Sequence, residues 1–308
     1  MITTVSLNPS IDLSLFIPKL SQGDSHRAKH SRQDISGKAV NTAYALQNLG
    51  VSCRVLGLDF TENGQLLKDS LKKADVTYDY VSAPGAMRTN IKIFEEDQQI
   101  MTEINQEGPA VSNDTVEAFL KLAAQDTSDI LVLSGSLPQG VESSIYKQII
   151  SQTNATVILD AYGEALRLGL EAQPAIIKPN QQELEQTFDV NLPNREEQVA
   201  FCRKLINKYN LYAVCLSQGY DGALMIGKDE LYFAPALKIP VRGVQGAGDS
   251  MVAGLAAELQ KNKNAPLDVL LKSAVAMAAA SLIREGTLMG LREDYLDMMR
   301  KVEIKCQN

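Results

Sequence analysis

The segment Gly246-Ala247-Gly248-Asp249 joins three small residues to a carboxylate, and it precedes a helix-compatible run from Met251 to Leu259. At a helix start several backbone N–H groups lack partners and the helix dipole favours negative charge, so small residues let an anion approach closely. A phosphoryl group in transit is such an anion. We expect Asp249 to be ionised there and to accept the proton of an alcohol. The segment therefore predicts phosphoryl transfer with Asp249 as the base.

Taken alone, this tetrapeptide would rather indicate only a tight turn followed by a helix cap, but other segments accompany it. In chain order these are Leu7-Asn8-Pro9, Ser36-Gly37-Lys38-Ala39-Val40-Asn41, Arg88-Thr89-Asn90-Ile91-Lys92, Ser134-Gly135-Ser136-Leu137-Pro138 and Lys178-Pro179-Asn180-Gln181-Gln182-Glu183. Their order, over nearly the whole chain, resembles that of the ribokinase-like (PfkB) carbohydrate kinases. Within that family the chain is most similar to the group of 1-phosphofructokinases and tagatose-6-phosphate kinases.

The resemblance implies a nucleotide half that is built around Asp249. In it, Gly246, Ala247 and Gly248 form an anion hole, Asn180 and Glu183 organise Mg²⁺ through water, and ATP is bound by Lys178, Asn180, Ser217, Gly219, Gly222 and Gly248. Positions three apart at a helix start share a face, and Mg²⁺ keeps several of its waters. A helix cap at Asn180 and a glycine turn after Ser217 are the alternatives. Adenine would lie along Ser273 to Leu282. No GxxxxGK[ST] is present, so a P-loop is not expected.

The resemblance also implies an acceptor half near the N-terminus. Its sugar- and phosphate-binding candidates are Asp12, Gly37, Lys38, Asn41, Arg88 and Asn90, with Arg27 and Lys92 as further basic candidates. Arginine suits bidentate phosphate binding and lysine offers a compact charge, so we assign Lys38 and Arg88 to the phosphate of the acceptor. Asp12 would orient sugar hydroxyls. His26 and His30 are interpreted as packed or exposed residues rather than as bases.

Two departures from the family pattern concern the ligands. The family usually has Gly-Gly-Lys-Gly where this chain has Ser36-Gly37-Lys38-Ala39, and the methyl group of Ala39 could crowd the sugar. Before the anion hole, Gly243-Val244-Gln245 replaces the common Asn-Thr or Asp-Thr, which weakens the inference of a monovalent-cation site.

The favoured hypothesis is a 1-phosphofructokinase, which makes fructose 1,6-bisphosphate from fructose 1-phosphate and ATP. A tagatose-6-phosphate kinase is the first alternative, and a non-catalytic sugar-phosphate sensor is an alternative of another class. A dinucleotide-dependent oxidoreductase would need GxGxxG after the first strand, where Leu7-Asn8-Pro9-Ser10 stands instead.

The 308 residues carry a formal net charge of -7, which argues against general binding of nucleic acid or acidic membranes. The partners expected are ATP and a small phosphorylated ketohexose. The four cysteines have no metal or CxxC spacing, and no run approaches the roughly 18 apolar residues of a membrane span. Because the N-terminus also lacks a basic leader, we expect a cytoplasmic protein.

The elements that must position these residues alternate between strands and helices, which predicts an α/β sandwich with helices on both faces of a parallel sheet. The resemblance implies that this is one ribokinase-like domain over residues 1–308, a three-layer α/β/α sandwich. Predicted strands are Ile2 to Leu7, Cys53 to Leu58, Ile130 to Leu133, Thr156 to Leu159, Ala175 to Ile177 and Tyr212 to Leu216, followed by a meander, Ala223 to Ile226 and Glu230 to Ala234. Predicted helices are Val40 to Leu49, Gly64 to Lys73, Asp114 to Ala124, Ser143 to Ile150 and Arg195 to Lys208.

Two segments, 11–35 and 88–105, lack helical periodicity and show strand-like alternation instead. They predict a small separate sheet that forms a lid over the carboxyl ends of the main strands. The resemblance to the family implies that such lid sheets could pair two copies of the chain into a homodimer.

Overall fold

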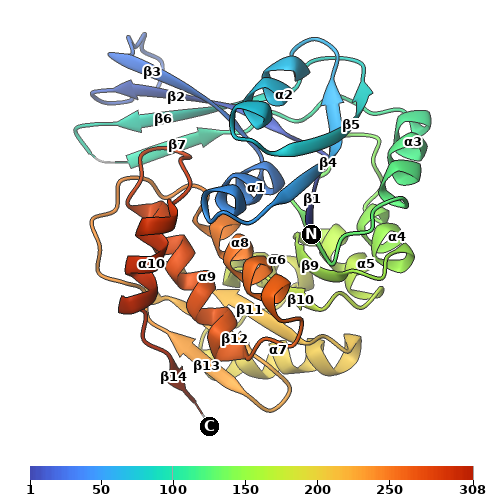
Figure 1. The fold of residues 1–308 in the computed structure, drawn as a ribbon. Coiled ribbons are helices and arrows are strands. Elements are labelled where there is room, and N and C mark those ends of the chain that lie inside the picture. Colours follow the sequence, from blue (N-terminus) through green and yellow to red (C-terminus); the bar gives the residue numbers. More distant parts are fainter. Residues whose placement is uncertain (99, 308) are drawn as a thin grey trace.

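A ten-stranded sheet forms the centre of the computed structural model, which describes residues 1–98 and 100–307 (Figure 1). Its parallel part is, in spatial order, β5 (Thr77–Ala83), β4 (Cys53–Phe60), β1 (Ile2–Ser6), β8 (Ile130–Ser134), β9 (Thr156–Asp160), β10 (Ile176–Ile177) and β11 (Ala213–Ser217). An antiparallel meander of β12 (Ala223–Ile226), β13 (Leu231–Ala234) and β14 (Lys305–Cys306) completes it. The predicted, mostly parallel sheet is confirmed.

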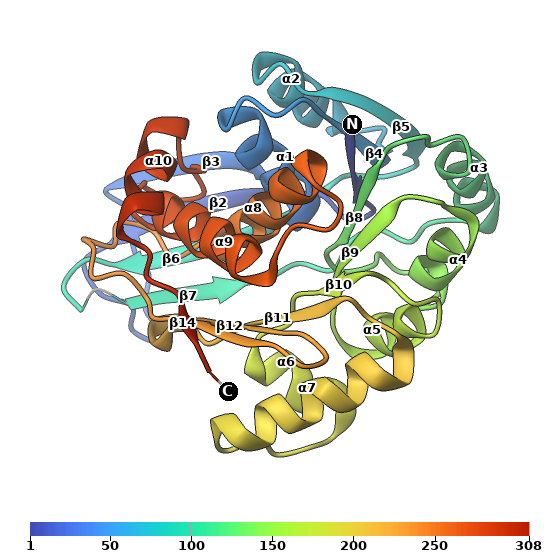
Figure 2. The ribbon, with the colours of Figure 1, turned by 60° about the horizontal axis from the view of Figure 1, so that its bottom comes forward.

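Helices cover both faces of this sheet, which gives three layers (Figures 1 and 2). One face carries α1 (Lys38–Asn48), α2 (Gly64–Lys73), α8 (Ala247–Lys261), α9 (Leu267–Leu282) and α10 (Arg292–Lys301). The other carries α3 (Asn113–Ala123), α4 (Ile145–Gln152), α5 (Gly163–Leu170), α6 (Gln181–Phe188) and α7 (Arg195–Tyr209). A single 3₁₀ turn, η1 (Gly219–Asp221), follows β11. The predicted α/β/α sandwich is therefore confirmed.

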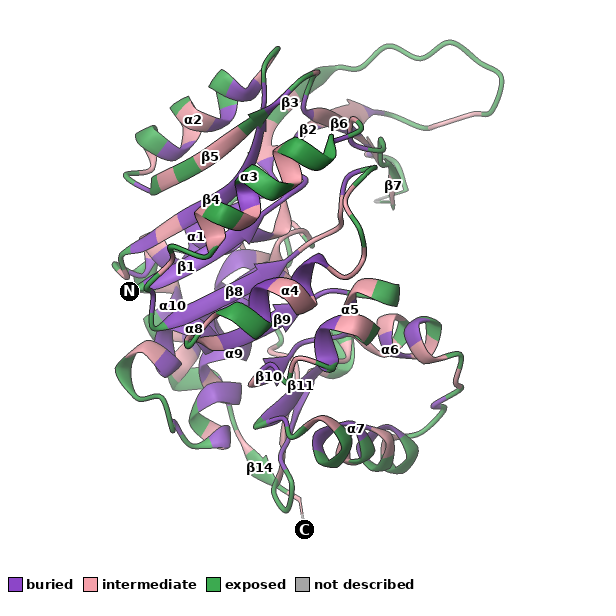
Figure 3. Ribbon diagram, turned by 90° about the vertical axis from the view of Figure 1, so that its right-hand side faces the viewer, coloured by how far each residue is buried: buried purple, intermediate pink, exposed green. Residues whose placement is uncertain are grey.

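The central strands are buried on both faces because helices cover each side of the sheet (Figure 3). Every residue of β1 and of β8 is buried, and the two strands pair in parallel. Such strands read as continuous apolar or small-residue runs rather than as alternating ones. Ser6 and Ser134 end these two strands, at the edge where the sheet meets the ligand-binding side.

A second, four-stranded sheet stands apart from the first, in the order β3-β2-β6-β7. It consists of β2 (Ser10–Ile17), β3 (His30–Ser36), β6 (Arg88–Glu95) and β7 (Ile100–Ile104). Figure 1 shows it projecting beyond one end of the main sheet, above α10. The small separate sheet predicted over 11–35 and 88–105 is confirmed, and we refer to it as the lid sheet.

The structure differs from the sequence prediction at one edge of the main sheet. Strand β5 was not among the predicted strands. It is an edge strand, and its polar residues Thr77, Asp79 and Ser82 leave too few apolar side chains for a clear strand pattern. The helix predicted from Ser143 begins at Ile145 instead. Within the described residues, no helix has both the length and the apolar character needed to cross a membrane.

Candidate active site

A cavity of about 600 Å³ opens at the carboxyl ends of the parallel strands, between the main sheet and the lid sheet. We call it the large cavity. Ser6, Ser134, Asp160 and Ser217 end β1, β8, β9 and β11, and all four line it, as does Lys178 just after β10. Neighbouring parallel strands end at one edge of a sheet, so residues far apart in sequence meet there.

Most of the sequence-predicted site residues meet in this cavity. Its lining includes Gly37, Lys38, Asn41, Arg88, Asn90, Lys178, Asn180, Glu183, Ser217, Gly219, Gly246, Gly248 and Asp249. Ala247 and Gly222 line the neighbouring apolar cavity described below, and Asp12 lies just behind the wall. Segments that are distant in the chain thus converge as the predicted site requires.

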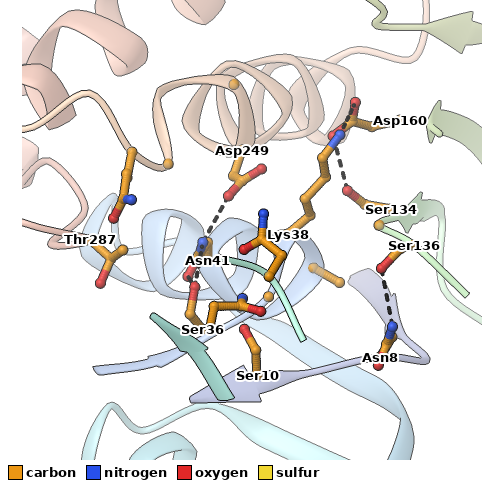
Figure 4. Close-up of a pocket in the computed structure, with 18 of the residues that line it drawn as sticks. Asn8, Ser10, Ser36, Lys38, Asn41, Ser134, Ser136, Asp160, Asp249 and Thr287 are labelled. Carbon is orange, nitrogen blue, oxygen red and sulfur yellow. Dashed lines mark hydrogen bonds and ion pairs between the residues drawn. The ribbon is translucent and has the colours of Figure 1, made fainter. Parts of the chain in front are cut away.

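Asp249 lies in the first turn of α8, three residues after Gly246, which caps the helix with a left-handed backbone at φ 72°. Asn41 Nδ2 donates a hydrogen bond to Asp249 Oδ2 at 2.8 Å, and Thr42 Oγ1 donates to the Asp249 carbonyl at 3.2 Å. Figure 4 shows Asn41 reaching from α1 toward the carboxylate. Helix α1, from the N-terminal part of the chain, therefore holds both the side chain and the backbone of Asp249.

The protonation of Asp249 differs from the expectation based on the helix start. Burial raises the pKa of Asp249 to about 6, although the positive charge of Lys38 and the Asn41 hydrogen bond act in the opposite direction. The helix start was expected to favour the ionised form of Asp249, and the direction of the pKa shift is the opposite. The loss of hydration on burial is the largest cause of this raised pKa. A carboxylate with a pKa near 6 is a stronger base than an ordinary one, and most of it is still ionised at pH 7.

Asp160 joins two lysines at the floor of the large cavity. Its Oδ1 lies 3.1 Å from Lys178 Nζ and 3.4 Å from Lys38 Nζ, and Ser134 Oγ donates to its Oδ2 at 3.0 Å. Burial alone would raise the pKa of Asp160, but the two lysines hold it below its ordinary value. Burial would likewise lower the pKa of Lys38, yet the neighbouring carboxylates raise it. Lys38 therefore stays a cation, and both lysine side chains line the cavity that would receive phosphates.

Asn180 and Glu183 form a capping box at the start of α6. Asn180 Oδ1 accepts from the Glu183 backbone N–H at 2.7 Å, and Glu183 Oε2 accepts from the Asn180 N–H at 2.8 Å. The helix-cap alternative is thus confirmed, but it does not exclude a ligand role, since both residues also line the large cavity. Glu183 Oε1 lies 3.4 Å from Lys38 Nζ and faces the cavity.

This donor set fits a magnesium ion that keeps most of its water ligands. Amide and carboxylate oxygens suit Mg²⁺, which takes few protein ligands when it accompanies nucleotide phosphates. Among the residues that the structure describes, no group of three or more His, Cys, Asp or Glu side chains could hold a metal ion. Binding of the ion through water at Asn180 and Glu183 stays a prediction.

The lid sheet contributes a polar wall from β2 and β6. Asp12 Oδ1 accepts from Asn90 Nδ2 at 2.9 Å, and Asp12 Oδ2 lies 2.5 Å from Lys92 Nζ. Asp12 is 2% exposed and is absent from the cavity lining, whereas Asn90 and Lys92 line it. In this structure Asp12 holds these two side chains in place rather than facing a ligand itself.

Arg88 presents its guanidinium beside this wall. It donates to the carbonyl oxygens of Asn8 at 3.3 Å and Gln106 at 3.4 Å, and burial lowers its pKa. The other candidates of the lid sheet lie elsewhere: Arg27, His26 and His30 are exposed and do not line the large cavity. His26 is bonded to Ser21, and His30 stacks on Phe16, as expected for packed or exposed histidines.

An apolar cavity of about 310 Å³ adjoins the large cavity and shares Ser217, Gly219 and Gly248 with it. Its walls come from the meander, the connection into α8, and α9, and they include Ala223, Leu237, Val275, Ala278, Ala279 and Leu282. Flat aromatic rings suit such a slot. The region is the one predicted to receive adenine along Ser273 to Leu282, and that assignment stays a prediction.

Sequence reasoning missed several residues that line the large cavity. They are Ser6, Ser10, Glu103, Asp160, Tyr162, Gln245 and Thr287, whereas Asn8, Ser134 and Ser136 also line the cavity and belong to segments singled out in the sequence. A signal existed for Asp160, a carboxylate directly after the predicted buried strand Thr156 to Leu159. Glu103 and Gln245 had none, because only the folded chain brings them together.

Comparison with known proteins agrees with this geometry. A family model described as "pfkB family carbohydrate kinase" matches residues 4–293. The chain is 31% identical over 308 residues to the 1-phosphofructokinase of Bacillus subtilis strain 168, covering 99% of each chain. It is 34% identical over 261 residues to the 1-phosphofructokinase of Rhodobacter capsulatus, covering 82% of each.

Among solved structures, that of phosphofructokinase-2 from Escherichia coli in complex with substrates and products is similar to this one. It matches with a TM-score of 0.91 at 26% identity, covering 97% of this chain and 98% of that chain. The family match also includes every segment that lines the large cavity, from Ser6 to Thr287. The chain therefore belongs to the pfkB family of carbohydrate kinases.

Proposed function

We propose that this protein is an ATP-dependent 1-phosphofructokinase that converts fructose 1-phosphate into fructose 1,6-bisphosphate. One observation carries the proposal: the buried base Asp249 lies where the two cavities meet, and the adjacent Gly248 lines both of them. A polar cavity with a lysine pair suits a phosphosugar and nucleotide phosphates, and the apolar cavity suits a base. The curated relatives named above are 1-phosphofructokinases.

In the proposed reaction, Asp249 accepts the proton of the acceptor hydroxyl as that oxygen attacks the γ-phosphorus of ATP. The backbone N–H groups at the start of α8 and the cations Lys38 and Lys178 stabilise the charge on the transferred group. Arg88 binds the phosphate that the acceptor already carries. Lys38 lies beside Asp160 and Glu183. At this position its positive charge would stabilise the transferred phosphoryl group as well as the acceptor phosphate that was predicted for it.

Asn180 and Glu183 would hold Mg²⁺ through water. When bound, that ion would neutralise charge on the nucleotide phosphates. The chain's own contribution is to fix these two side chains by their capping box, which uses Asn180 Oδ1 and Glu183 Oε2 and leaves Glu183 Oε1 outside it.

The acceptor is tested by a coupled assay of ADP release with magnesium ATP. Fructose 1-phosphate should be turned over most efficiently, ahead of tagatose 6-phosphate and of fructose 6-phosphate, the ligand in a solved structure of phosphofructokinase-2 from Escherichia coli. A higher kcat/KM for either 6-phosphate would overturn the assignment of the acceptor. Ligand binding without turnover would favour the sugar-phosphate sensor instead.

We further infer that the lid sheet joins two copies of the chain. Side chains alternate along its strands, so Leu13, Leu15, Ile91, Ile93 and Ile104 share the face opposite Asn90 and Lys92. Ile104 is 55% exposed, and such an apolar sheet face is stabilised when a partner covers it. An Ile91→Lys variant should sediment as a monomer where the wild type sediments as a dimer. A monomeric wild type would refute this inference.

A further inference from the structure

Gln245 and Glu103 meet across the rim of the large cavity, which both residues line. Gln245 Nε2 donates a hydrogen bond to Glu103 Oε1 at 2.8 Å and lies 3.5 Å from Met101 Sδ. Glu103 and Met101 belong to β7, whereas Gln245 directly precedes Gly246 at the start of α8. The bond therefore connects the lid sheet to the segment proposed to receive the phosphoryl group.

The opposite edge of the lid sheet also contacts the catalytic end of the molecule. Strands β3 and β7 are its two edge strands. On β3, Arg32 Nη1 donates to the Glu285 carbonyl at 3.2 Å, while its Nε and Nη2 donate to Asp34 Oδ1 at 3.0 and 2.9 Å. The lid sheet is thus bonded at both edges to the loops that flank α8 and follow α9.

These two loops are packed tightly against each other. A Cβ added to Gly243 would lie 2.7 Å from the Gly286 carbonyl oxygen, and one added to Gly246 would lie 2.3 Å from Met289 Cε. The backbone at Gly243 therefore packs directly against the backbone at Arg284 and Gly286, and Gly246 packs against the Met289 side chain. A shift of either edge of the lid sheet would therefore be transmitted to the backbone of the proposed anion hole.

We propose that Gln245 is a positioning residue, whose bond to Glu103 holds the segment Gly246-Ala247-Gly248 in place while the lid sheet covers the acceptor. The proposal rests on the proposed kinase function and adds to it. Glu103 pairs in register with Lys92, which lines the acceptor side of the cavity. Acceptor bound at that wall would fix β7, and through Glu103 it would fix Gln245. The link predicts an effect on kcat rather than on the affinity for ATP.

The test exchanges the two side chains. Gln245→Glu places two carboxylates opposite each other and removes the hydrogen bond. It should lower kcat about tenfold, which is the lower end of the effect expected for losing a hydrogen bond to a charged group. The KM for ATP should change little. The double variant Gln245→Glu with Glu103→Gln re-forms the bond with donor and acceptor exchanged. It should recover kcat to within about threefold of the wild type.

Gln65→Glu is the matched control, since exposed Gln65 donates to the Asp69 carboxylate at 2.8 Å on α2, outside both cavities. It should leave kcat unchanged. Near-normal kcat in Gln245→Glu, or no recovery in the double variant, would overturn the positioning role while the wild type remains an active kinase. A wild type that phosphorylates no phosphosugar would instead refute the proposed function, and the positioning role with it.

Discussion

Asn41 Nδ2 lies 2.8 Å from Asp249 Oδ2, so the proposed base is bonded to α1 rather than to a residue of its own helix. Helix α1 begins two residues after β3, the edge strand of the lid sheet. The residue that tunes the base thus belongs to the segment that leads directly out of the lid sheet. This bond favours the ionised carboxylate, and burial opposes it.

The rate should depend on pH through Asp249, whose pKa is raised to about 6. A protonated carboxyl group cannot accept the acceptor's proton, so kcat should fall as pH drops below about 6. Asn41→Ala removes a hydrogen bond that lowers this pKa, and the acidic limb should move to higher pH. Profiles of kcat from pH 5 to 8.5 measure the shift. A limb that stays in place or moves to lower pH would contradict this assignment.

Ser36→Ala provides the control for that profile. Ser36 Oγ exchanges hydrogen bonds with the Asn41 amide at 3.3 and 3.4 Å, and none between Ser36 and Asp249 is found in the described structure. Its removal should loosen Asn41 without removing the bond to the base. The acidic limb should therefore move less than in Asn41→Ala.

Asp249→Asn should abolish turnover while ATP still binds. General-base catalysis typically contributes about 10²–10⁴-fold, and the amide cannot accept the proton. Asparagine has nearly the same shape and can still accept the hydrogen bond from Asn41, so the cavity should persist. Calorimetric titration with ATP and the coupled assay separate the two effects. A kcat within about tenfold of the wild type would refute the role of Asp249 as the base.

The chemistry at Asp249 could be read from the sequence because it depends on contiguous segments. Gly246-Ala247-Gly248-Asp249 and the capping pair Asn180 and Glu183 carry local patterns, and each segment indicated a turn or a helix start. The main sheet and the lid sheet were predictable for a similar reason, because buried parallel strands and alternating strands have different apolar patterns.

What the sequence could not reveal is how groups from different segments act on each other. Asp249 was expected to be ionised by the helix start, but it is buried, and α8 packs against α1 and α9, which are distant in sequence from each other. Only the folded chain brings Asp160 between Lys38 and Lys178. The same holds for the hydrogen bond from Gln245 to Glu103. Edge strand β5 was missed because solvent contact weakens the periodicity on which prediction depends.

The substitution Asp249→Asn should also show that the ionised Asp249 carboxylate lowers the free energy of unfolding. The pKa of Asp249 is raised from 3.8 to about 6, so the folded state favours the protonated form. That favourable contribution is complete below about pH 3.8 and is lost as pH rises through 6, amounting to roughly 3 kcal/mol. The asparagine side chain never ionises, so the variant should gain stability relative to the wild type as pH rises between those values. Urea unfolding at pH 4.5 and pH 8 measures this, and a pH-independent difference would exclude it.

Arg88→Ala should raise the KM for the acceptor more than the KM for ATP. Arg88 lies on β6 in the polar wall of the lid sheet, and the apolar cavity does not include it. Losing a charge-assisted contact to a phosphate typically costs about 1.5–3 kcal/mol, or roughly ten- to a hundredfold in kcat/KM. Arg88→Lys should recover part of the lost kcat/KM, because lysine restores the positive charge but not the bidentate geometry of the guanidinium group. If only the KM for ATP changed, the acceptor phosphate would lie elsewhere.

Ala278→Leu should block the nucleotide base without disturbing the acceptor. Ala278 is half-buried on α9 and lines the apolar cavity, so a larger side chain would grow into the cavity rather than into the core. About three extra carbon atoms would occupy part of the space of about 310 Å³ that we assign to adenine. We expect the KM for ATP to rise at least about tenfold while the KM for fructose 1-phosphate stays near that of the wild type. Ala278→Ser, which nearly keeps the volume, should leave both KM values unchanged. A higher KM for the sugar phosphate alone would mean that the two cavities exchange their assigned ligands.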